Sequence, residues 1–344
     1  MIALRELGGT GLKVTELGFG TAPLGNLFRP LPDETARATL AAADAAGFGY
    51  YDTAPFYGFG LSERRLGDSL RRDALRLRNN IVLSTKVGRL LKPVPGPVDQ
   101  TIVRDGYATP MPFEPVYDYS YDAVMRSFEA SLQRLGLSKI EILYIHDIGR
   151  LTHGEQNAAR MAELTKGGGL KALEELRAAK VISGFGMGVN EVPACLEVMR
   201  HARLDVILLA GRYTLLEQNP LDDLFPLCEK AGTAIVVGGP YNSGILAVGT
   251  KTAALLYYDY APAPAEVIEK VRRIEAVCDR HGVPLPAAAL QFPLAHRLVA
   301  SVIPGLDSPE RVNQTIALYR HKIPAALWQE LRHEKLVRTD SPVP

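Results

Sequence analysis

Cysteine is scarce in this sequence. The chain of 344 residues contains three cysteines, Cys195, Cys228 and Cys278, which lie far apart and follow no Cys-x-x-Cys or Cys/His spacing. Disulfide-bonded mini-folds and structural zinc sites depend on such spacing. We therefore expect neither a disulfide framework nor a metal site.

Long apolar runs and an excess of charge of one sign are also missing. No apolar run approaches the length of a membrane-spanning helix, and the N-terminal MIALRELGGTG lacks the apolar centre of a signal peptide. Lysine and arginine number 39 against 38 aspartates and glutamates, which gives a net charge of +1. A nearly neutral chain has no general electrostatic affinity for nucleic acid or an anionic membrane. We expect a cytoplasmic protein that binds neither.

The remaining composition is that of a globular protein. Apolar residues make up 47% and charged residues 22% of the chain, which argues against wholesale disorder. The length fits two or three average domains, or one α/β barrel with insertions. The order of the predicted strands and helices has to decide between these.

Strand and helix patterns alternate along the chain. A hairpin is predicted first (ALREL, GGTG, LKV), and eight strand-like segments follow, each succeeded by a helical pattern. The predicted strands are Glu16–Gly20, Tyr50–Thr53, Ile81–Lys86, Ile140–His146, Ile182–Val189, Val206–Ala210, Ala234–Val237 and Val299–Ile303. Regular alternation predicts a parallel α/β sheet. Eight units without a linker predict one (β/α)8 TIM barrel over residues 1–344, with an extra C-terminal helix at Pro324–Leu336.

An open, doubly wound sheet is the alternative architecture. Such a sheet would carry a G-x-G-x-x-G fingerprint after its first strand, and GFGTAPLGN is a poor match to it. The closed barrel is therefore favoured.

Local signals indicate where several helices begin and end. Asp33 opens the first helix and Gly47 is placed to end it, while Gly136 is placed to end a later one. Ser62 is the expected N-cap of the second helix.

Two connections are longer than is usual between a strand and a helix. Val87–Tyr119 contains six prolines, which favours a stiff course, and Asp147–Gly168 is shorter and polar. Long loops at the mouth of a barrel usually cover or shape a site. Surface decoration is the alternative for each.

Polar side chains stand at the ends of consecutive predicted strands. Asp52 ends the second and Tyr57 follows on its loop, Lys86 ends the third and His146 the fourth. The fifth strand leads into Asn190. In a TIM barrel these ends meet at one face, where the chemistry occurs.

These side chains suit proton transfer at a carbonyl or carbinol oxygen. A neighbouring ammonium from Lys86 is expected to lower the pKa of Tyr57, and a carboxylate such as Asp52 would hold that ammonium. A neutral His146 could donate a hydrogen bond to a substrate oxygen. Hydride transfer with a nicotinamide cofactor is the natural partner chemistry. Each residue alone has an ordinary structural role as an alternative, and their convergence argues for a site.

Glycine-rich turns follow the last two strands. GGPYNSGIL follows the seventh strand, and IPGLDSPERVNQT follows the eighth, where a helix begins at Ser308–Pro309. Such turns and helix N-termini hold phosphate in barrels of this type. We expect the cofactor to bind there.

These segments also resemble a known family. YYDTAPFYGFGLSERRLG, LSTKVG, LYIHD, GFGMGVN and VIPGLDSPERV are similar, in the same order, to blocks of the aldo-keto reductases, over about residues 4 to 320. The resemblance implies an (α/β)8 barrel that binds NAD(P)H without a Rossmann domain. It also implies a catalytic tetrad of Asp52, Tyr57, Lys86 and His146.

The resemblance further implies contacts with cofactor and substrate. Substrate contacts are expected from Phe56 and from the aromatic residues of the proline-rich loop, namely Phe113, Tyr117 and Tyr119, whose faces suit the C–H surface of a pyranose. The implied cofactor contacts are Thr21, Asn190, Gly239, Pro240, Asn242, Ser243, Gly244, Leu246, Gly305, Asp307, Arg311, Gln314 and Thr315. The residue that stacks on the nicotinamide in many relatives matches Gly238 here, and Tyr241 or Tyr213 is expected to replace it.

Segments such as THGEQ and DYAPAP are similar to the aldose dehydrogenase branch of the family. This similarity implies NAD(P)-dependent oxidation of a cyclic hemiacetal at C1 to a lactone, with L-fucose, D-arabinose or L-galactose as the aldose. Oxidation of the pyridoxal hemiacetal, or a non-catalytic nucleotide-binding barrel, are the alternatives. Asp307 near the expected 2′-phosphate position favours NAD, with NADP usable. A homo-oligomer stays open, because Trp328 could pack on the barrel or on a partner.

Overall fold

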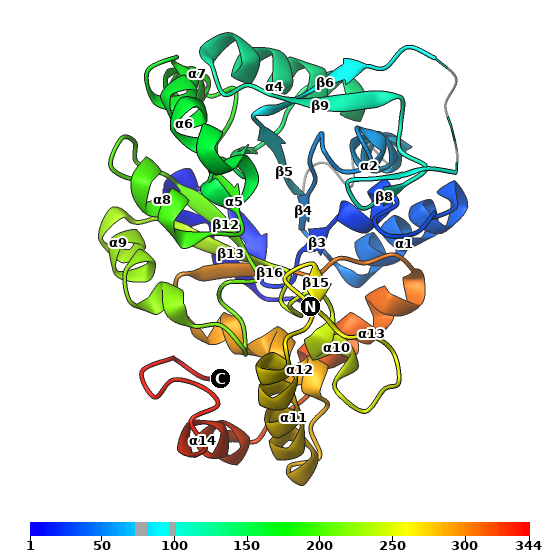
Figure 1. The fold of residues 1–344 in the computed structure, drawn as a ribbon, viewed down its shortest axis with the longest axis vertical. Coiled ribbons are helices and arrows are strands. Elements are labelled where there is room, and N and C mark those ends of the chain that lie inside the picture. Colours follow the sequence, from blue (N-terminus) through cyan, green and yellow to red (C-terminus); the bar gives the residue numbers. More distant parts are fainter. Residues whose placement is uncertain (73–80, 97–98, 100) are drawn as a thin grey trace.

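Eight parallel strands form a nearly closed barrel in the computed structural model, which describes residues 1–72, 81–96, 99 and 101–344 (Figure 1). Neighbours in the barrel follow the order of the sequence. The strands are β3 (Phe19–Gly20), β4 (Tyr50–Asp52), β5 (Val82–Val87), β10 (Ile142–His146), β11 (Gly184–Val189), β12 (Val206–Ala210), β13 (Ala234–Gly238) and β16 (Val299–Ile303). Parallel bridges between Leu17 and Val302 and between Gly20 and Gly305 bring the last strand back to the first. The predicted TIM barrel is confirmed.

Helices surround the strands (Figure 1). The outer α-helices are α1 (Asp33–Ala46), α2 (Leu61–Arg72), α4 (Tyr121–Leu135), α7 (Gly169–Ala178), α8 (Val192–Val198), α9 (Leu224–Ala231), α11 (Ala265–Arg280), α12 (Leu285–Gln291), α13 (Pro309–Arg320) and α14 (Ala325–His333). Short 3₁₀ turns are η1 (Gly8–Thr10), η2 (Ala22–Gly25), η4 (Asn219–Leu221) and η5 (Phe292–Ala295). Gly47 and Gly136 end α1 and α4 with φ of +87° and +62°, as predicted.

The N-cap prediction for α2 is wrong. The helix already begins at Leu61, so Ser62 lies inside it. Its hydroxyl donates instead to the carbonyl oxygen of Thr21 at 2.8 Å. A serine near a helix start has the same sequence signal in both roles, because both use the short side chain to satisfy nearby backbone.

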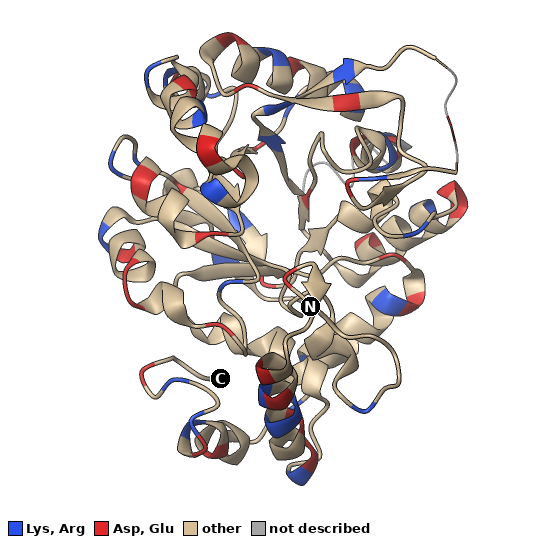
Figure 2. Cartoon of the chain, viewed as in Figure 1, with Lys and Arg blue, Asp and Glu red and all other residues tan. Residues whose placement is uncertain are grey.

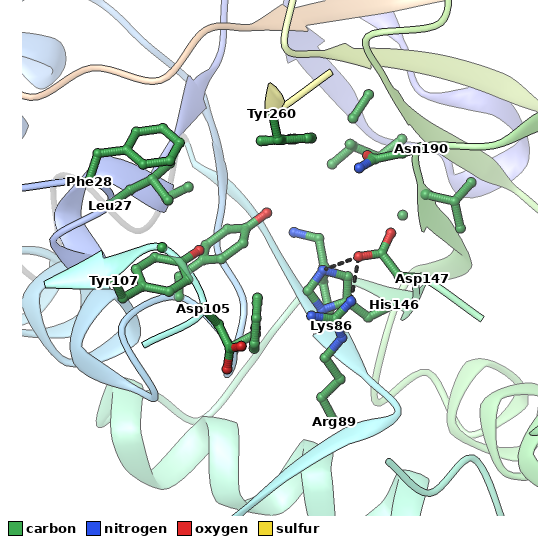
Figure 3. Close-up of a pocket in the computed structure, with 18 residues that line it drawn as sticks. Leu27, Phe28, Lys86, Arg89, Asp105, Tyr107, His146, Asp147, Asn190 and Tyr260 are labelled. Carbon is green, nitrogen blue, oxygen red and sulfur yellow. Dashed lines mark hydrogen bonds and ion pairs between the residues drawn. The ribbon is translucent and has the colours of Figure 1, made fainter. Parts of the chain in front are cut away.

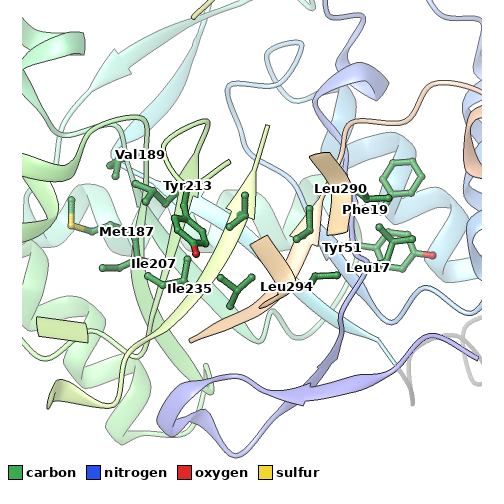
Figure 4. Close-up of a cluster of buried hydrophobic side chains, with 14 of the residues drawn as sticks. Leu17, Phe19, Tyr51, Met187, Val189, Ile207, Tyr213, Ile235, Leu290 and Leu294 are labelled. Carbon is green, nitrogen blue, oxygen red and sulfur yellow. The ribbon is translucent and has the colours of Figure 1, made fainter. Parts of the chain in front are cut away.

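Side chains alternate along the strands between two apolar clusters. On β12, Val206 and Leu208 belong to the cluster inside the barrel, whereas Ile207 and Leu209 belong to the cluster between barrel and helices. Figure 4 shows this second cluster, with Met187, Val189 and Ile235 among its members. The site therefore stands on a barrel that is packed on both faces.

The strand β11 turns glycines toward the barrel interior. Phe185, Met187 and Val189 pack outward, so Gly184, Gly186 and Gly188 face inward by alternation. A Cβ on Gly186 would overlap the carbonyl oxygen of Val206. A Cβ on Gly188 would lie 3.1 Å from the Cε atom of Lys86. These glycines leave the interior volume that a long side chain from another strand needs.

Segments near the two ends of the chain pack against the barrel. The predicted hairpin, β1 (Leu4–Glu6) and β2 (Lys13–Thr15), is confirmed, and the adjoining Leu7 and Val14 complete the inner cluster. On α14, Trp328 is 1% exposed, with its ring 6.3 Å from that of Phe292. Trp328 thus packs on its own barrel.

The proline-rich connection carries short strands. The pair β6 (Arg89–Pro93) and β9 (Phe113–Tyr117) and the pair β7 (Val103–Arg104) and β8 (Tyr107–Ala108) are both antiparallel. Residues 97, 98 and 100, and hence Pro97, lie outside the described part. Prolines can occur in these short strands because an edge strand does not need every backbone N–H group for pairing.

The second long connection is not the loop that its polar sequence indicated. It folds into α5 (Arg150–His153), η3 (Gly154–Gln156) and α6 (Asn157–Thr165). The buried apolar face of α6 consists only of Met161 and Leu164. Two apolar residues are too few to reveal a helical periodicity in the sequence. After β13, α10 (Ile245–Val248) precedes a hairpin of β14 (Tyr257–Tyr258) and β15 (Ala261–Pro262).

Charges of both signs are interspersed over the outer helices, as along α11 in Figure 2. Within the described ranges, no helix is long and apolar enough to cross a membrane.

The glycine face of β11 leads to a stability prediction. We expect Gly186→Ala to lower the free energy of unfolding by about 1–3 kcal/mol, because the added Cβ forces backbone apart in a packed interior. Gly9→Ala is the matched control, since its Cβ would meet side chains and no backbone: the tip of the flexible Arg203 side chain at 3.1 Å and Oδ1 of Asp205 at 3.8 Å. Urea denaturation of both variants measures the difference, and equal midpoints would contradict the packing argument.

Candidate active site

A cavity of about 440 Å³ opens at the carboxyl ends of the barrel strands (Figure 3). The structure brings together five residues that the sequence singled out: Phe56, Tyr57, Lys86, His146 and Asn190. The other lining residues are Ala22, Leu27, Phe28, Arg89, Asp105, Gly106, Tyr107, Asp147, Gly188, Val189, Leu208, Ala210 and Tyr260.

Lys86 and Asp52 form a buried ion pair below the cavity. The Nζ atom of Lys86 lies 2.6 Å from Oδ2 of Asp52 and donates to the carbonyl oxygen of Thr53 at 2.9 Å. Both residues are 2% exposed. Burial raises the pKa of Asp52 above its usual range, and the ammonium limits that rise.

A polar network inside the barrel fixes the carboxylate. Ser84 donates to Oδ1 of Asp52 at 2.7 Å, and the Tyr50 hydroxyl joins Ser84 at 3.0 Å and Tyr144 at 2.9 Å. These side chains come from β4, β5 and β10. The network satisfies buried polar atoms that would otherwise destabilise the barrel.

Tyr57 lies above the ion pair, at the rim of the cavity. Its ring centroid is 4.7 Å from the Lys86 Nζ atom and 6.1 Å from the centroid of His146. The expectation of a lowered pKa is not met, because burial and then Asp52 raise the pKa of Tyr57 well above 10. The ammonium of Lys86 is neutralised by Asp52 at 2.6 Å, so desolvation dominates. The phenol therefore keeps its proton at neutral pH.

His146 is neutral, as expected. Its side chain is 6% exposed, and burial together with the charges of Arg89 and Lys86 lowers its pKa well below 6.5. Since a neutral imidazole carries one N–H, it can donate to a substrate oxygen.

The aromatic residues expected from the proline-rich loop lie outside the cavity wall. The Tyr119 hydroxyl donates to the carbonyl oxygen of His146 at 2.7 Å and joins His153 Nε2 at 2.9 Å, so Tyr119 supports the site from behind. Tyr117 meets His153 edge to face, with the two ring centroids 4.8 Å apart. Phe113 pairs with Pro93 at the far end of the β6–β9 hairpin.

Sequence reasoning missed several lining residues. Asp147 follows His146 directly and has the strand-end signal that identified its neighbour, and Arg89 lies three residues beyond Lys86. Asp105 lies on the turn between β7 and β8, and Tyr107 begins β8. Tyr260 comes from the β14–β15 hairpin, which folds back over the barrel from far along the chain (Figure 3); no local signal indicates this.

The glycine-rich loop after β13 forms a cradle of left-handed backbone. Gly239, Asn242, Ser243 and Gly244 have φ of +54°, +44°, +58° and +100°. The Asn242 Nδ2 atom donates to the carbonyl oxygen of Gly211 at 3.0 Å, and its Oδ1 atom is buried without a hydrogen-bond partner. Such backbone presents N–H groups to an anion, and the free amide oxygen suits a polar ligand.

The loop after β16 gathers charge. Asp307 is paired with Arg29 and lies 2.9 Å from the Nε atom of Arg311, and the Ser308 hydroxyl accepts from the Arg311 N–H at the start of α13. The cradle and this helix start together fit the phosphates of a dinucleotide.

The remaining expected cofactor residues occupy different environments. Thr21, Leu246 and Thr315 are buried. The Thr21 hydroxyl donates a hydrogen bond to the carbonyl oxygen of Asp52 at 2.8 Å. Pro240 is buried beside the cradle, while Gly305 and Gln314 are exposed.

Neither expected substitute for the stacking residue lines the cavity. Tyr213 is fully buried, its ring 4.6 Å from Phe225. Tyr241 has its hydroxyl buried without a partner. Tyr260 is the aromatic residue that projects over the cavity beside Asn190 (Figure 3).

The fold and the site together define an α/β barrel in which a tyrosine, a histidine and a lysine–aspartate pair surround one cavity, an arrangement suited to proton transfer. The model of the Aldo/keto reductase family matches residues 16–333. The chain belongs to this family.

Individual relatives are similar over nearly the whole chain. Pyridoxal 4-dehydrogenase of Microbacterium luteolum is 46% identical, with 97% of each chain covered. D-threo-aldose 1-dehydrogenase of a Pseudomonas species is 40% identical, with 96% of each covered. Among solved structures, the holo form of an aldo-keto reductase from Bacillus halodurans aligns with a TM-score of 0.74 at 26% identity, covering 98% of this chain and 97% of that one.

The electrostatics of the tetrad lead to a pH prediction. Because the pKa of Tyr57 is raised, we predict that any reaction in which this phenol accepts a proton accelerates as pH rises. In Lys86→Met the charge of Asp52 is no longer offset, and the rising limb of the pH–rate profile should move about 1–3 units higher. Lys86→Arg, which keeps the charge, is the control. A Lys86→Met profile that superimposes on the wild-type profile would contradict the coupling.

Proposed function

We propose that the protein oxidises a cyclic hemiacetal at its carbinol carbon to a lactone, with NAD(P) as hydride acceptor and an aldose such as L-fucose, D-arabinose or L-galactose as substrate. The observation that carries the proposal is the convergence of Tyr57, His146 and the Lys86–Asp52 pair on one cavity. The similarity to D-threo-aldose 1-dehydrogenase supports the substrate class.

The chain's own residues divide the work at the reacting oxygen. His146 donates a hydrogen bond to the carbinol oxygen and orients it. Tyr57 takes the hydroxyl proton, and Lys86 offsets the negative charge of Asp52 next to it. Asn190 and the Gly239–Gly244 cradle would hold the dinucleotide, whose nicotinamide would accept the hydride from the carbinol carbon when bound.

The walls of the cavity suit a ring with a polar edge. Phe28, Phe56 and Tyr107 line it with aromatic faces, while Arg89 and Asp147 present charge. A pyranose has apolar C–H faces and a hydroxyl periphery.

Pyridoxal is the second candidate substrate. Its hemiacetal offers the same carbinol carbon, its flat ring also suits aromatic walls, and the 46% identical relative is a pyridoxal 4-dehydrogenase. The aldose and pyridoxal proposals share one reaction and differ in the chemical groups that surround the ring of the substrate.

A substrate panel tests the proposed function. We expect L-fucose, D-arabinose or L-galactose to reduce NAD or NADP, followed by absorbance at 340 nm, with pyridoxal assayed in parallel. Absence of cofactor reduction with every aldose and with pyridoxal would overturn the proposal.

The proton acceptor can be tested by one substitution. Tyr57→Phe should keep the fold and dinucleotide binding but lose about 10²–10⁴-fold in kcat, since the positioned acid–base group is gone. Tyr121→Phe, whose hydroxyl bonds Glu175 on the outer helices at 2.6 Å, is the matched control. Near-normal turnover of Tyr57→Phe would remove the tyrosine from the mechanism.

Cofactor preference is expected to depend on Asp307. This carboxylate engages both Arg29 and Arg311, which leaves neither guanidinium free for the 2′-phosphate of NADP. We propose that NAD is preferred, and that Asp307→Ser frees both cations.

The ratio of kcat/KM with NADP to that with NAD should then rise about 10- to 100-fold, which corresponds to one charge-assisted contact. Asp44→Ser, which removes an exposed carboxylate near the C-terminal end of α1, is the control. A wild type that already prefers NADP tenfold would contradict the assignment.

A further inference from the structure

A charged pair that proton transfer does not need forms part of the cavity wall. The Nη2 atom of Arg89 lies 2.5 Å from Oδ2 of Asp147, with the two side chains 5% and 19% exposed. Desolvating two charges offsets most of their attraction, so a buried pair is weak evidence for stability. Because the pair forms part of the cavity wall, we consider a role in substrate binding.

The backbone at Asp147 is set in an unusual conformation. This residue follows β10 directly and has φ of +42°, a region that residues other than glycine adopt at an energetic cost. Its N–H donates to the carbonyl oxygen of Gly188 at 3.0 Å, which holds the turn. The turn directs the carboxylate into the cavity next to His146 instead of along the strand (Figure 3).

One of the two oxygens of the Asp147 carboxylate is available to accept a hydrogen bond. Oδ2 is bound by Arg89 and lies 3.5 Å from Nε2 of His146. Oδ1 of Asp147 makes no hydrogen bond to any residue in the described ranges. An ionised carboxylate accepts hydrogen bonds only, and those it accepts are stronger than neutral ones. The cavity therefore presents a fixed acceptor beside the histidine that orients the reacting oxygen.

Arg89 is itself held rigidly. Its guanidinium stacks 4.2 Å from the ring of Phe56 and 5.4 Å from that of Tyr117. Its Nη2 atom donates to Oδ2 of Asp147. Arg89 thus acts as a positioning residue for the carboxylate.

We propose that Asp147, positioned by Arg89, accepts a hydrogen bond from the hydroxyl on the carbon next to the reacting carbon, and so selects aldoses that carry a C2 hydroxyl. The inference rests on the proposed function, because it uses His146 to place the C1 oxygen. Neighbouring hydroxyls of a sugar are a few ångströms apart, and Nε2 of His146 lies 3.5 Å from Oδ2 of Asp147, which places the carboxylate that carries the available Oδ1 next to the histidine. In pyridoxal the carbon next to the reacting carbon is a ring carbon without a hydroxyl, and the nearest ring oxygen is an acidic phenol one carbon further on, whose anion this carboxylate would repel.

Paired substrates separate this role from simple support of His146. We would measure kcat/KM for L-fucose and 2-deoxy-L-fucose, and for D-arabinose and its 2-deoxy analogue. The wild type should lose about 10- to 100-fold on the deoxy sugar, the range of one hydrogen bond to a charged group. Asp147→Gly, which tolerates the positive φ, should bring this ratio close to one.

Two further variants sharpen the test. Asp147→Asn keeps the shape of the side chain and should reduce the ratio partway, so the test survives if the glycine variant fails to fold. Arg89→Lys should also reduce it, because the point charge cannot hold the carboxylate as the stacked guanidinium does. Asp105→Asn removes another carboxylate from the cavity wall and should keep the wild-type ratio.

Each contrary outcome has its own meaning. If the Asp147 variants lose rate equally on both sugars and keep the wild-type ratio, the residue acts through His146 and the inference is overturned. A wild type that oxidises pyridoxal but no aldose would also overturn it, while leaving hemiacetal oxidation in place. A wild type that oxidises neither would overturn the proposed function itself.

Discussion

The buried Lys86–Asp52 pair is the constraint on which the rest of the site depends. Two charges 2.6 Å apart inside a barrel persist only where every remaining polar atom is satisfied, because an unpaired charge there is strongly destabilising. Ser84 and the Thr53 carbonyl provide that satisfaction. The pair also determines the electrostatics at Tyr57. Asp52 neutralises the charge of the Lys86 ammonium, so burial becomes the main influence on the pKa of Tyr57 and raises it.

The barrel makes room for this pair by leaving side chains out. A Cβ on Gly188 would press on the aliphatic stem of Lys86, and Gly188 and Ala210 leave their part of the cavity wall without bulky side chains. The same small residues open the cavity that the substrate needs. Packing, charge burial and binding space are thus consequences of one arrangement, in which β11 contributes backbone and no bulk.

Sequence reasoning found what local patterns encode and missed what tertiary folding brings together. The strands, the glycines that end α1 and α4, and the tetrad residues at strand ends all have signals within a few residues. Tyr260 has none, because its hairpin reaches the cavity from about 70 residues beyond Asn190 in the chain. Tyr119 was expected at the substrate and lies behind His146, since an aromatic side chain suits either place. The lowered pKa expected for Tyr57 was wrong because residue spacing does not reveal how deeply the phenol is buried, and burial is the main cause of its raised pKa.

The claim that most needs direct proof is that hydride leaves the hemiacetal carbon. A reaction with an aldose deuterated at C1 and with NAD or NADP, followed by NMR, tests it in one experiment. The account predicts deuterium on the nicotinamide ring and a lactone as the first carbohydrate product. Reduced cofactor without deuterium, or oxidation at another carbon of the sugar, would contradict it.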